Sequence, residues 1–200
     1  MIAVAFSACE NTYESQHTAG IYLRDILLHG FGIKPENYTF NKTKEGKPYA
    51  EDAPFCFSIS HSRVLCCCAV SVNASFSADT ALHSSADLHL HVETEPISPW
   101  IWENSTLLFP GISGEIGLDL EKVDFDADLS RLAKITKRYL YNAPQPSDAA
   151  DFYKSWTRQE AYGKYTGQGF LAKPDPSVSL YSFRVIHQDT TYFLSLACNP

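Results

Sequence analysis

The chain has 200 residues, of which 44% are hydrophobic and 13% aromatic, and its formal net charge is −7 at pH 7. This composition supports one sizeable core or two smaller units that share an interface, and it excludes an intrinsically disordered chain. The negative charge argues against a general nucleic-acid binder, because phosphate backbones attract clustered lysine and arginine side chains. No apolar run reaches the roughly 18 residues of a membrane span, so we expect none.

The N-terminal stretch MIAVAFSACENTYE has neither the basic start nor the long apolar run of a signal peptide. It is typical of a first β-strand, and we expect a cytoplasmic protein with reduced cysteines. Cys66, Cys67 and Cys68 are consecutive in the apolar run VLCCCAVSV. Because alternate residues of a strand point to opposite faces, these cysteines are expected to be small buried hydrophobes. No Cys-x-x-Cys pair indicates a zinc site.

The first part of the chain predicts a helix, a short strand with a turn, and a hairpin. Residues 16–29 carry an apolar stripe at helical spacing, and Gly30 ends it. The stretch YTFNKTKEGKPY predicts a short strand followed by a turn at Gly46 and Pro48. Residues 55–60 and 64–72 predict two strands joined as a hairpin. Residues 73–113 fit no regular pattern, and a segment of this length is usually functional, mobile, or a small hairpin of its own.

The second part of the chain begins near Gly114. It predicts a strand around Asp119, helices over residues 129–140 and 147–165, and closing strands over 177–186 and 191–197. The order is helix, strand and hairpin, followed by strand, two helices and hairpin. This order predicts an α+β protein with two halves, residues 1–113 and 114–200.

Two acids, Asp119 and Glu121, alternate with leucines in the stretch EIGLDLEKV, so we expect both on one face of a strand. In the last helix, positions 152, 156, 160 and 164 recur every four residues and form one stripe. The stripe begins with Phe152 and ends with Glu160 and Lys164. A core-facing stripe that turns polar indicates that its polar end lines a cavity.

Setting Glu160 beside Asp119 and Glu121 brings three carboxylates together, and these repel one another unless a cation lies between them. Hard oxygen ligands without Cys or His suit Mg²⁺, which also binds phosphate oxygens. Lys164 would then supply positive charge to a phosphate, and the expected chemistry is attack at a phosphate diester. The alternative is a solvated sheet face with an ordinary ion pair between Glu160 and Lys164.

Ser60 and His61 end a predicted strand in FSISHS, where a hydroxyl, an imidazole and free N–H groups can hold a phosphate. Adjacent strand residues face opposite ways, so these two cannot form the nucleophile–base pair of a serine hydrolase. The alternative is a capped turn with a satisfied histidine. Lys47 in EGKPY is by default an exposed turn lysine, and Pro48 stiffens its turn.

Together these motifs resemble one family, the 4'-phosphopantetheinyl transferases of the larger, monomeric, surfactin-synthetase-activating type. The matching blocks, in order, are Gly46-Lys47-Pro48, Phe57-Ser58-Ile59-Ser60-His61-Ser62, Gly117-Leu118-Asp119-Leu120-Glu121 and Trp156-Thr157-Arg158-Gln159-Glu160-Ala161-Tyr162-Gly163-Lys164. The resemblance implies two similar α/β subdomains related by a pseudo-twofold axis, with coenzyme A in the cleft between them. It also implies a monomer that acts on acyl or peptidyl carrier proteins of fatty-acid, polyketide or nonribosomal peptide synthesis.

The resemblance also implies a role for each matching residue. Asp119, Glu121 and Glu160 correspond to the magnesium ligands, Ser60 and His61 to contacts of the coenzyme A phosphates, Lys47 and Pro48 to the nucleotide side, Lys164 to the pyrophosphate contact, and Arg24 to a 3'-phosphate contact. The implied reaction is attack by a carrier serine hydroxyl on the pantetheine-side phosphorus, with Asp119, Glu160 and Lys164 as the catalytic residues and Glu160 as the base. Adenosine 3',5'-bisphosphate leaves.

Two departures from the family pattern leave other functions open. Gln159 stands where the family usually has lysine, which allows a coenzyme A-binding protein with weak or no transferase activity; a metal-dependent phosphohydrolase is a third possibility. Residues 73–113 form a probable insertion in the N-terminal half. Its polar residues His83, His89, His91, Glu93 and Glu95 are expected on a solvated hairpin, in preference to a second metal site.

Overall fold

The computed structural model describes residues 1–76, 88, 90–94, 101–103 and 106–199. The helices are α1 (Tyr13–Gly30), α2 (Leu129–Tyr139) and α3 (Ala149–Thr166), with a short 3-10 turn at Pro35–Asn37. The strands are β1 (Ile2–Ala8), β2 (Phe40–Lys42), β3 (Pro48–Ala50), β4 (Phe55–Ser62), β5 (Leu65–Val72), β6 (Leu90–Thr94), β7 (Ile101–Glu103), β8 (Thr106–Phe109), β9 (Ile116–Lys122), β10 (Ser179–His187) and β11 (Thr190–Cys198).

The strands form two main sheets, with the orders β4-β5-β1-β8-β7 and β6-β10-β11-β9, and β2 pairs with β3 in a separate hairpin. Both halves use the same connections. A first strand leads into helix and then into a hairpin whose second strand returns beside the first: β1 pairs with β5, and β9 pairs with β11, both antiparallel. This arrangement agrees with the α+β class that the order of predicted elements indicated.

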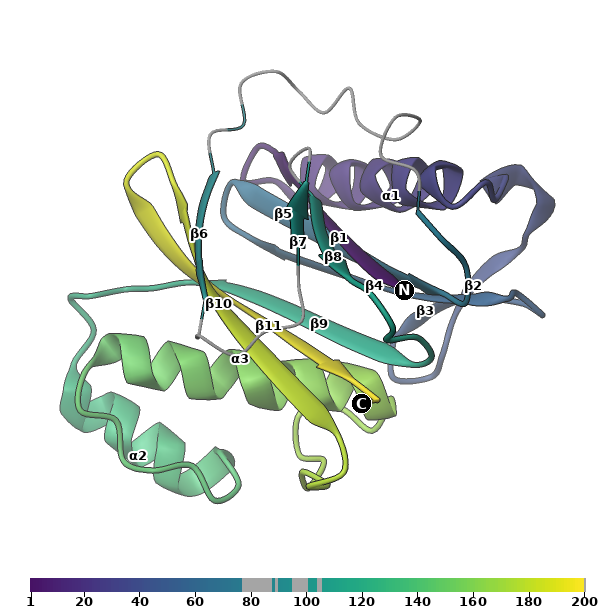
Figure 1. Cartoon of the computed structure of the whole chain (residues 1–200). Helices are drawn as coiled ribbons and strands as arrows, with labels where there is room; N and C mark the ends of the chain where they lie inside the picture. Colours follow the sequence, from purple (N-terminus) through teal and green to yellow (C-terminus); the bar gives the residue numbers. More distant parts are fainter. Residues whose placement is uncertain (77–87, 89, 95–100, 104–105, 200) are drawn as a thin grey trace.

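The elements stack in layers, with α1 on one outer side and α2 and α3 on the other (Figure 1). The core between the sheets contains Val4 and Cys67 from the first sheet and Leu118 and Leu194 from the second. A second core, which includes Cys66 and Cys68, lies under α1. Cys66, Cys67 and Cys68 are 0% exposed and free, so the predicted alternation of small buried residues is confirmed.

Local signals explain where the helices begin and end. Asp128 and Asp148 cap α2 and α3, each through a carboxylate that accepts backbone N–H bonds of the first turn. α3 ends at Gly167, whose φ of 68° is a left-handed conformation that glycine adopts without strain. α1 is capped by Thr12, which accepts from the Ser15 amide. All three helices lie close to the ranges that the apolar spacing predicted.

Residues 73–113, described in part, contribute strands to both sheets. β8 pairs with β1 and is fully buried, whereas β6 pairs with β10 at the edge of the other sheet. On β6, His91 is exposed, and Glu93 forms an ion pair with Arg184 at 3.0 Å. His83, His89 and Glu95 lie outside the described residues. The irregular sequence pattern gave no indication that this range supplies a central strand.

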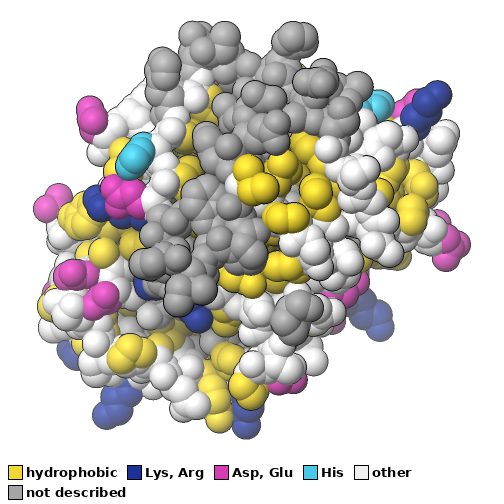
Figure 2. Space-filling view, viewed as in Figure 1, with side chains coloured by type: hydrophobic (Ala, Val, Ile, Leu, Met, Phe, Trp, Pro, Cys, Tyr) yellow, Lys and Arg dark blue, Asp and Glu magenta, His cyan; other side chains and the backbone are white. Residues whose placement is uncertain are grey.

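On the face shown in Figure 2, hydrophobic side chains gather toward the middle, and charged side chains lie mainly toward the outline. No helix in the described part of the chain is both long enough and apolar enough to cross a membrane.

Candidate functional site

The two sheets meet along β4 and β9, which are edge strands of their respective sheets. Three hydroxyls on one face of β4 accept backbone N–H bonds from β9: Ser58 from Leu118 at 3.0 Å, Ser60 from Leu120 at 3.1 Å, and Ser62 from Lys122 at 3.0 Å. We call these residues the serine ladder. An edge strand normally leaves every second N–H without a strand partner, and here serine side chains satisfy those groups.

Asp119 lies at the centre of this junction and is only 5% exposed. Its Oδ1 atom accepts from the Ser60 hydroxyl at 3.1 Å and from the Lys164 ammonium at 2.8 Å. Lys164 Nζ also donates to Ser60 Oγ at 3.1 Å, so the three groups form a closed triangle. The Asp119 Oδ2 atom is buried and has no hydrogen-bond partner among the described residues. A buried carboxylate oxygen without a partner is costly, and it marks a position that suits a cation.

The pKa values of Glu121 and Glu160 are both raised, in part because other acids lie nearby. Burial raises the pKa of Glu121, and the charges of Asp119 and Glu160 add to the increase, although the hydrogen bond from Ser62 lowers it. Burial also raises the pKa of Glu160, again reinforced by Asp119. Burial opposes the charge of Lys164, yet the Asp119 carboxylate raises its pKa above the ordinary value. The site therefore holds an ammonium group among acids that repel one another.

Close packing of α3 on β9 brings these groups together. A Cβ atom on Gly117 would lie 2.0 Å from the carbonyl oxygen of Ala161 and 2.3 Å from the amide nitrogen of Tyr165. Only glycine permits this approach. The glycine that precedes Asp119 by two positions therefore allows the helix bearing Glu160 and Lys164 to lie directly on the acidic strand.

A cavity of about 280 Å³ opens beside the triangle, and we call it the cleft. It is lined by residues from both halves: Glu45, Gly46, Lys47, Pro48, Ser58, Ile59, Glu160, Gly163, Lys164, Gly167 and Gly169. A neighbouring side cavity of about 600 Å³ shares Gly46, Pro48 and Ile59 with the cleft and includes His17, Arg24, Phe40 and His61. Of the residues predicted to contact coenzyme A, all but Ser60 line one of these two spaces.

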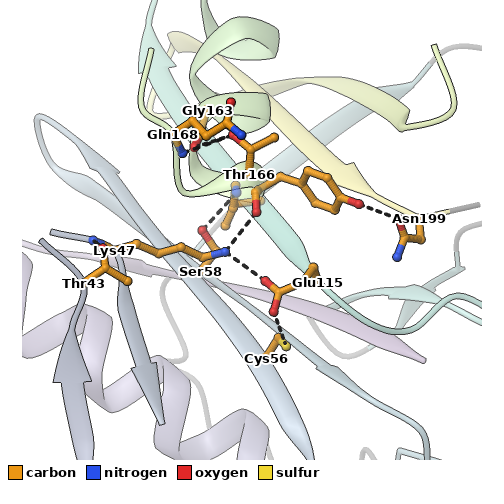
Figure 3. A network of polar contacts seen from close by, with 11 residues as sticks. Thr43, Lys47, Cys56, Ser58, Glu115, Gly163, Thr166, Gln168 and Asn199 are labelled. Atoms are coloured by element: carbon orange, nitrogen blue, oxygen red, sulfur yellow. Dashed lines mark hydrogen bonds and ion pairs between the residues drawn. The ribbon is translucent and has the colours of Figure 1, made fainter. Parts of the chain in front are cut away.

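Lys47 bridges the two halves at the edge of the cleft (Figure 3). Its ammonium nitrogen lies 2.9 Å from Glu115 Oε2 and donates to the Tyr165 carbonyl at 3.1 Å. Glu115 also accepts from the Cys56 thiol at 3.4 Å. Burial, together with the charge of Glu115, raises the pKa of that thiol to about 11, so it stays protonated at neutral pH. Lys47 is therefore a cleft residue held in place by the opposite half.

Ser60 and His61 face opposite ways, as their adjacency on a strand predicted. The Ser60 hydroxyl donates to Asp119 and accepts from Leu120 and Lys164, which uses its full bonding capacity. His61 instead lines the side cavity, where partial burial and the charge of Lys164 lower its pKa. Ser60 therefore bonds the acidic site, whereas His61 faces the side cavity.

Arg24 also lines the side cavity but already has partners. Its guanidinium bonds the Asp25 carboxylate through two nitrogens, at 2.8 and 2.7 Å, and lies over the Phe40 ring at 3.6 Å from the centroid. An arginine held in this way is pre-oriented, and its remaining N–H groups can meet a phosphate at the cavity wall.

The donor set fits magnesium in its chemistry: carboxylate oxygens only, raised pKa values, and a buried Asp119 oxygen without a hydrogen bond. Asp119 and Glu121 come from β9 and Glu160 from α3. In the described part of the chain, however, no three His, Cys, Asp or Glu side chains are already gathered at metal-binding distance. The Lys164 ammonium instead neutralises Asp119 directly.

Gln159 lies outside the cleft. It is 5% exposed, and its Nε2 atom donates to the carbonyls of Phe170 and Ala172, both at 2.7 Å. It thus braces the loop after α3, which passes so close to Gly163 that a Cβ there would lie 2.5 Å from the Gly169 carbonyl oxygen. Gln159 stands where the resembling family usually has lysine, and its side chain bonds this loop. Ser62 and Glu115 were not identified from the sequence, although serine at every second position of β4 was a visible signal.

Comparison with known proteins gives one informative similarity. The chain is 26% identical over 167 residues to the 4'-phosphopantetheinyl transferase HetI of Nostoc sp. (strain PCC 7120). The alignment covers 79% of this chain and 54% of HetI, so the chain spans about half the length of that curated relative. No protein-family model matches the chain. The similarity supports a relationship to the 4'-phosphopantetheinyl transferases in general.

Proposed function

We propose that the chain is a magnesium-dependent 4'-phosphopantetheinyl transferase of the monomeric, surfactin-synthetase-activating type. It would transfer the phosphopantetheine arm of coenzyme A to a serine of an apo acyl or peptidyl carrier protein. The observation that carries this proposal is the triangle of Asp119, Ser60 and Lys164 at a cleft between two halves of repeated topology. The similarity to HetI, which is named as a 4'-phosphopantetheinyl transferase, supports the general class of the reaction.

Coenzyme A would lie across the cleft and the side cavity, which adjoin at Pro48 and Ile59. The ligand is an anion with three phosphate groups, and the two spaces offer Lys47, Lys164 and Arg24 as positive charges. His61 faces the same space and can donate to a phosphate oxygen once protonated. The net charge of −7 then matters little, because recognition depends on this local basic lining.

Asp119, Glu121 and Glu160 would hold the magnesium ion, which when bound neutralises charge on the diphosphate. Lys164 orients the departing phosphate and stabilises its charge, since its raised pKa keeps it protonated. The carrier serine oxygen forms a bond to the pantetheine-side phosphorus while the bond to adenosine 3',5'-bisphosphate breaks. Glu160 accepts the serine proton, and its raised pKa makes it a stronger base than an ordinary carboxylate.

The alternative, a coenzyme A-binding protein without efficient catalysis, was suggested by Gln159. In the structure that side chain bonds the loop at residues 170–172, so the absence of lysine there takes no charge from the cleft. This observation favours the transferase over the alternative.

The test is transfer of labelled phosphopantetheine to a broad panel of apo carrier proteins. Asp119→Asn and Glu160→Gln are expected to lower transfer at least about 100-fold. Glu36→Gln, which changes an exposed acid outside both cavities, is the matched control and should transfer normally. Coenzyme A binding without labelling of any carrier would instead identify the binding protein, and hydrolysis of coenzyme A without carrier would identify a phosphohydrolase.

A further inference from the structure

Ser62 occupies the last position of β4 and the last rung of the serine ladder. It is 8% exposed, and its hydroxyl accepts from the Lys122 amide at 3.0 Å. The same hydroxyl donates to Glu121 Oε2 at 3.0 Å. Since the backbone amide supplies the incoming bond, the single hydroxyl proton is directed at the carboxylate.

The Glu121 side chain also borders a separate cavity. Glu121 lines this cavity of about 410 Å³ together with Asp128, Arg131 and Trp156, which come from the start of α2 and from α3. A glutamate side chain has three rotatable bonds, so it can turn into that cavity, which holds the cation Arg131 beside Asp124 and Asp128. The Ser62 hydrogen bond is the described contact that holds Glu121 on the side of Asp119.

The ladder therefore joins the backbone of β9 to its acids. Ser60 bonds both Leu120 and Asp119, and Ser62 bonds both Lys122 and Glu121. Ser58 bonds the Leu118 amide, and the residue next to Leu118 on the acid-bearing face is Gly117, which has no side chain to orient. The N-terminal half thus contacts each acid of β9 through one hydroxyl.

We propose that Ser62 is a positioning residue, which fixes the Glu121 carboxylate beside Asp119 so that the N-terminal half orients the divalent-ion ligands of the C-terminal half. This inference rests on the proposed function, in that it takes Glu121 as a ligand of the ion. Hydrogen bonds from outer residues to carboxylate ligands typically change metal affinity about 10- to 100-fold.

The experiment measures Mn²⁺ binding by calorimetry in the absence of coenzyme A and carrier, so the readout does not depend on catalysis. Ser62→Ala is expected to weaken Mn²⁺ binding about tenfold, whereas Ser62→Thr, which keeps the hydroxyl, stays within about twofold of the wild type. Ser182→Ala removes an equally buried hydroxyl, which bonds Ser195 and lines neither the cleft nor the side cavity, so it should leave Mn²⁺ affinity unchanged. In the transfer assay, Ser62→Ala should need about tenfold more Mg²⁺ and recover its rate at saturating metal.

Should Ser62→Ala fail to fold, Ser62→Val against Ser62→Thr gives the same comparison with side chains of equal shape. Equal Mn²⁺ affinity of wild type and Ser62→Ala, or no Mn²⁺ binding by the wild type, would overturn the inference. Weakened Mn²⁺ binding in a protein that labels no carrier would uphold the role of Ser62 and refute the transferase instead, so the two failures are distinguishable.

Discussion

The ammonium nitrogen of Lys47 lies 2.9 Å from Glu115 Oε2, and this ion pair joins the β2–β3 hairpin to the residue that precedes β9. Lys47 also lines the cleft, so under the proposed function the carboxylate of Glu115 would compete with the phosphates of coenzyme A for one ammonium group. The Lys47 side chain is 17% exposed and that of Glu115 56% exposed. The pair is therefore partly screened by solvent, and it contributes at most about 1 kcal/mol.

Glu115→Gln is expected to lower the KM for coenzyme A about two- to fivefold with little change in kcat, because Lys47 is released from its protein partner. Steady-state kinetics with coenzyme A as the varied substrate measures this. Glu45→Gln removes the same charge from another lining residue of the cleft, and it should have the smaller effect. A rise in KM for Glu115→Gln would show instead that Glu115 holds Lys47 in its working position.

Gln159→Glu is expected to lower the free energy of unfolding by about 2–4 kcal/mol, because a carboxylate cannot donate to the carbonyls of Phe170 and Ala172. Gln159→Lys keeps N–H donors and should cost less. Thermal unfolding gives the stabilities, and transfer kinetics give the activity. If Gln159→Lys raises the transfer rate several-fold, the side chain at this position does reach the phosphates, contrary to the observed geometry.

The raised pKa values of Glu121 and Glu160 predict that protons compete with a divalent ion at this site. Apparent Mg²⁺ affinity should therefore fall as the pH drops from about 7.5 to about 5, because the carboxylates become protonated. In the metal-free protein, the same raised pKa values determine whether stability rises or falls with pH. The folded state binds more protons than the unfolded state, so the free energy of unfolding decreases as pH rises from the ordinary carboxyl value of 4.5 through the raised values.

Mg²⁺ is accordingly expected to raise the Tm more at neutral than at acidic pH, and thermal unfolding with and without the metal measures the difference. Glu121→Gln removes one of the two groups and should flatten the dependence. An increase in Tm of equal size at both pH values would show that the ion does not bind these carboxylates.

Gly117→Ala is expected to lower the free energy of unfolding by at least about 3 kcal/mol, because the added Cβ would meet the backbone of α3. Gly20→Ala is the matched control: its Cβ would lie 2.6 Å from Cγ2 of Ile59, so it meets a side chain where Gly117→Ala meets backbone. The control should therefore cost clearly less than Gly117→Ala, and both stabilities come from urea unfolding. Similar losses for the two variants would contradict the rigid contact between α3 and β9.

Much of the fold follows from local pattern. The four-residue repeat of α3 and the alternation in β9 placed Glu160, Lys164 and Asp119 on their elements, because helices and strands have fixed periods. Alternation likewise assigned Cys67 to a different core from its neighbours.

The contacts across the junction did not follow from pattern. The bond from Ser62 to Glu121 joins residues 59 positions apart, and it depends on how two sheet edges face each other. The hydrogen-bond partners of Gln159 could not be predicted from the sequence either. A helical wheel gives the side-chain direction, but the loop that receives its hydrogen bonds is set by packing at Gly163. Short strands such as β8, whose partner β1 lies about a hundred residues earlier, carry too little periodic signal to be recognised.

The position of β6 has a consequence for fragments of this chain. A break between residues 113 and 114 would separate the acid-bearing sheet from its own outermost strand, since β6 precedes the break and pairs with β10 behind it. The C-terminal piece would then display the bare backbone of β10, a template on which strands of other molecules readily assemble. A break before β6 would instead take β8 away from its partner β1, so one sheet loses a strand at either position. We therefore expect neither half to fold well as a separate fragment.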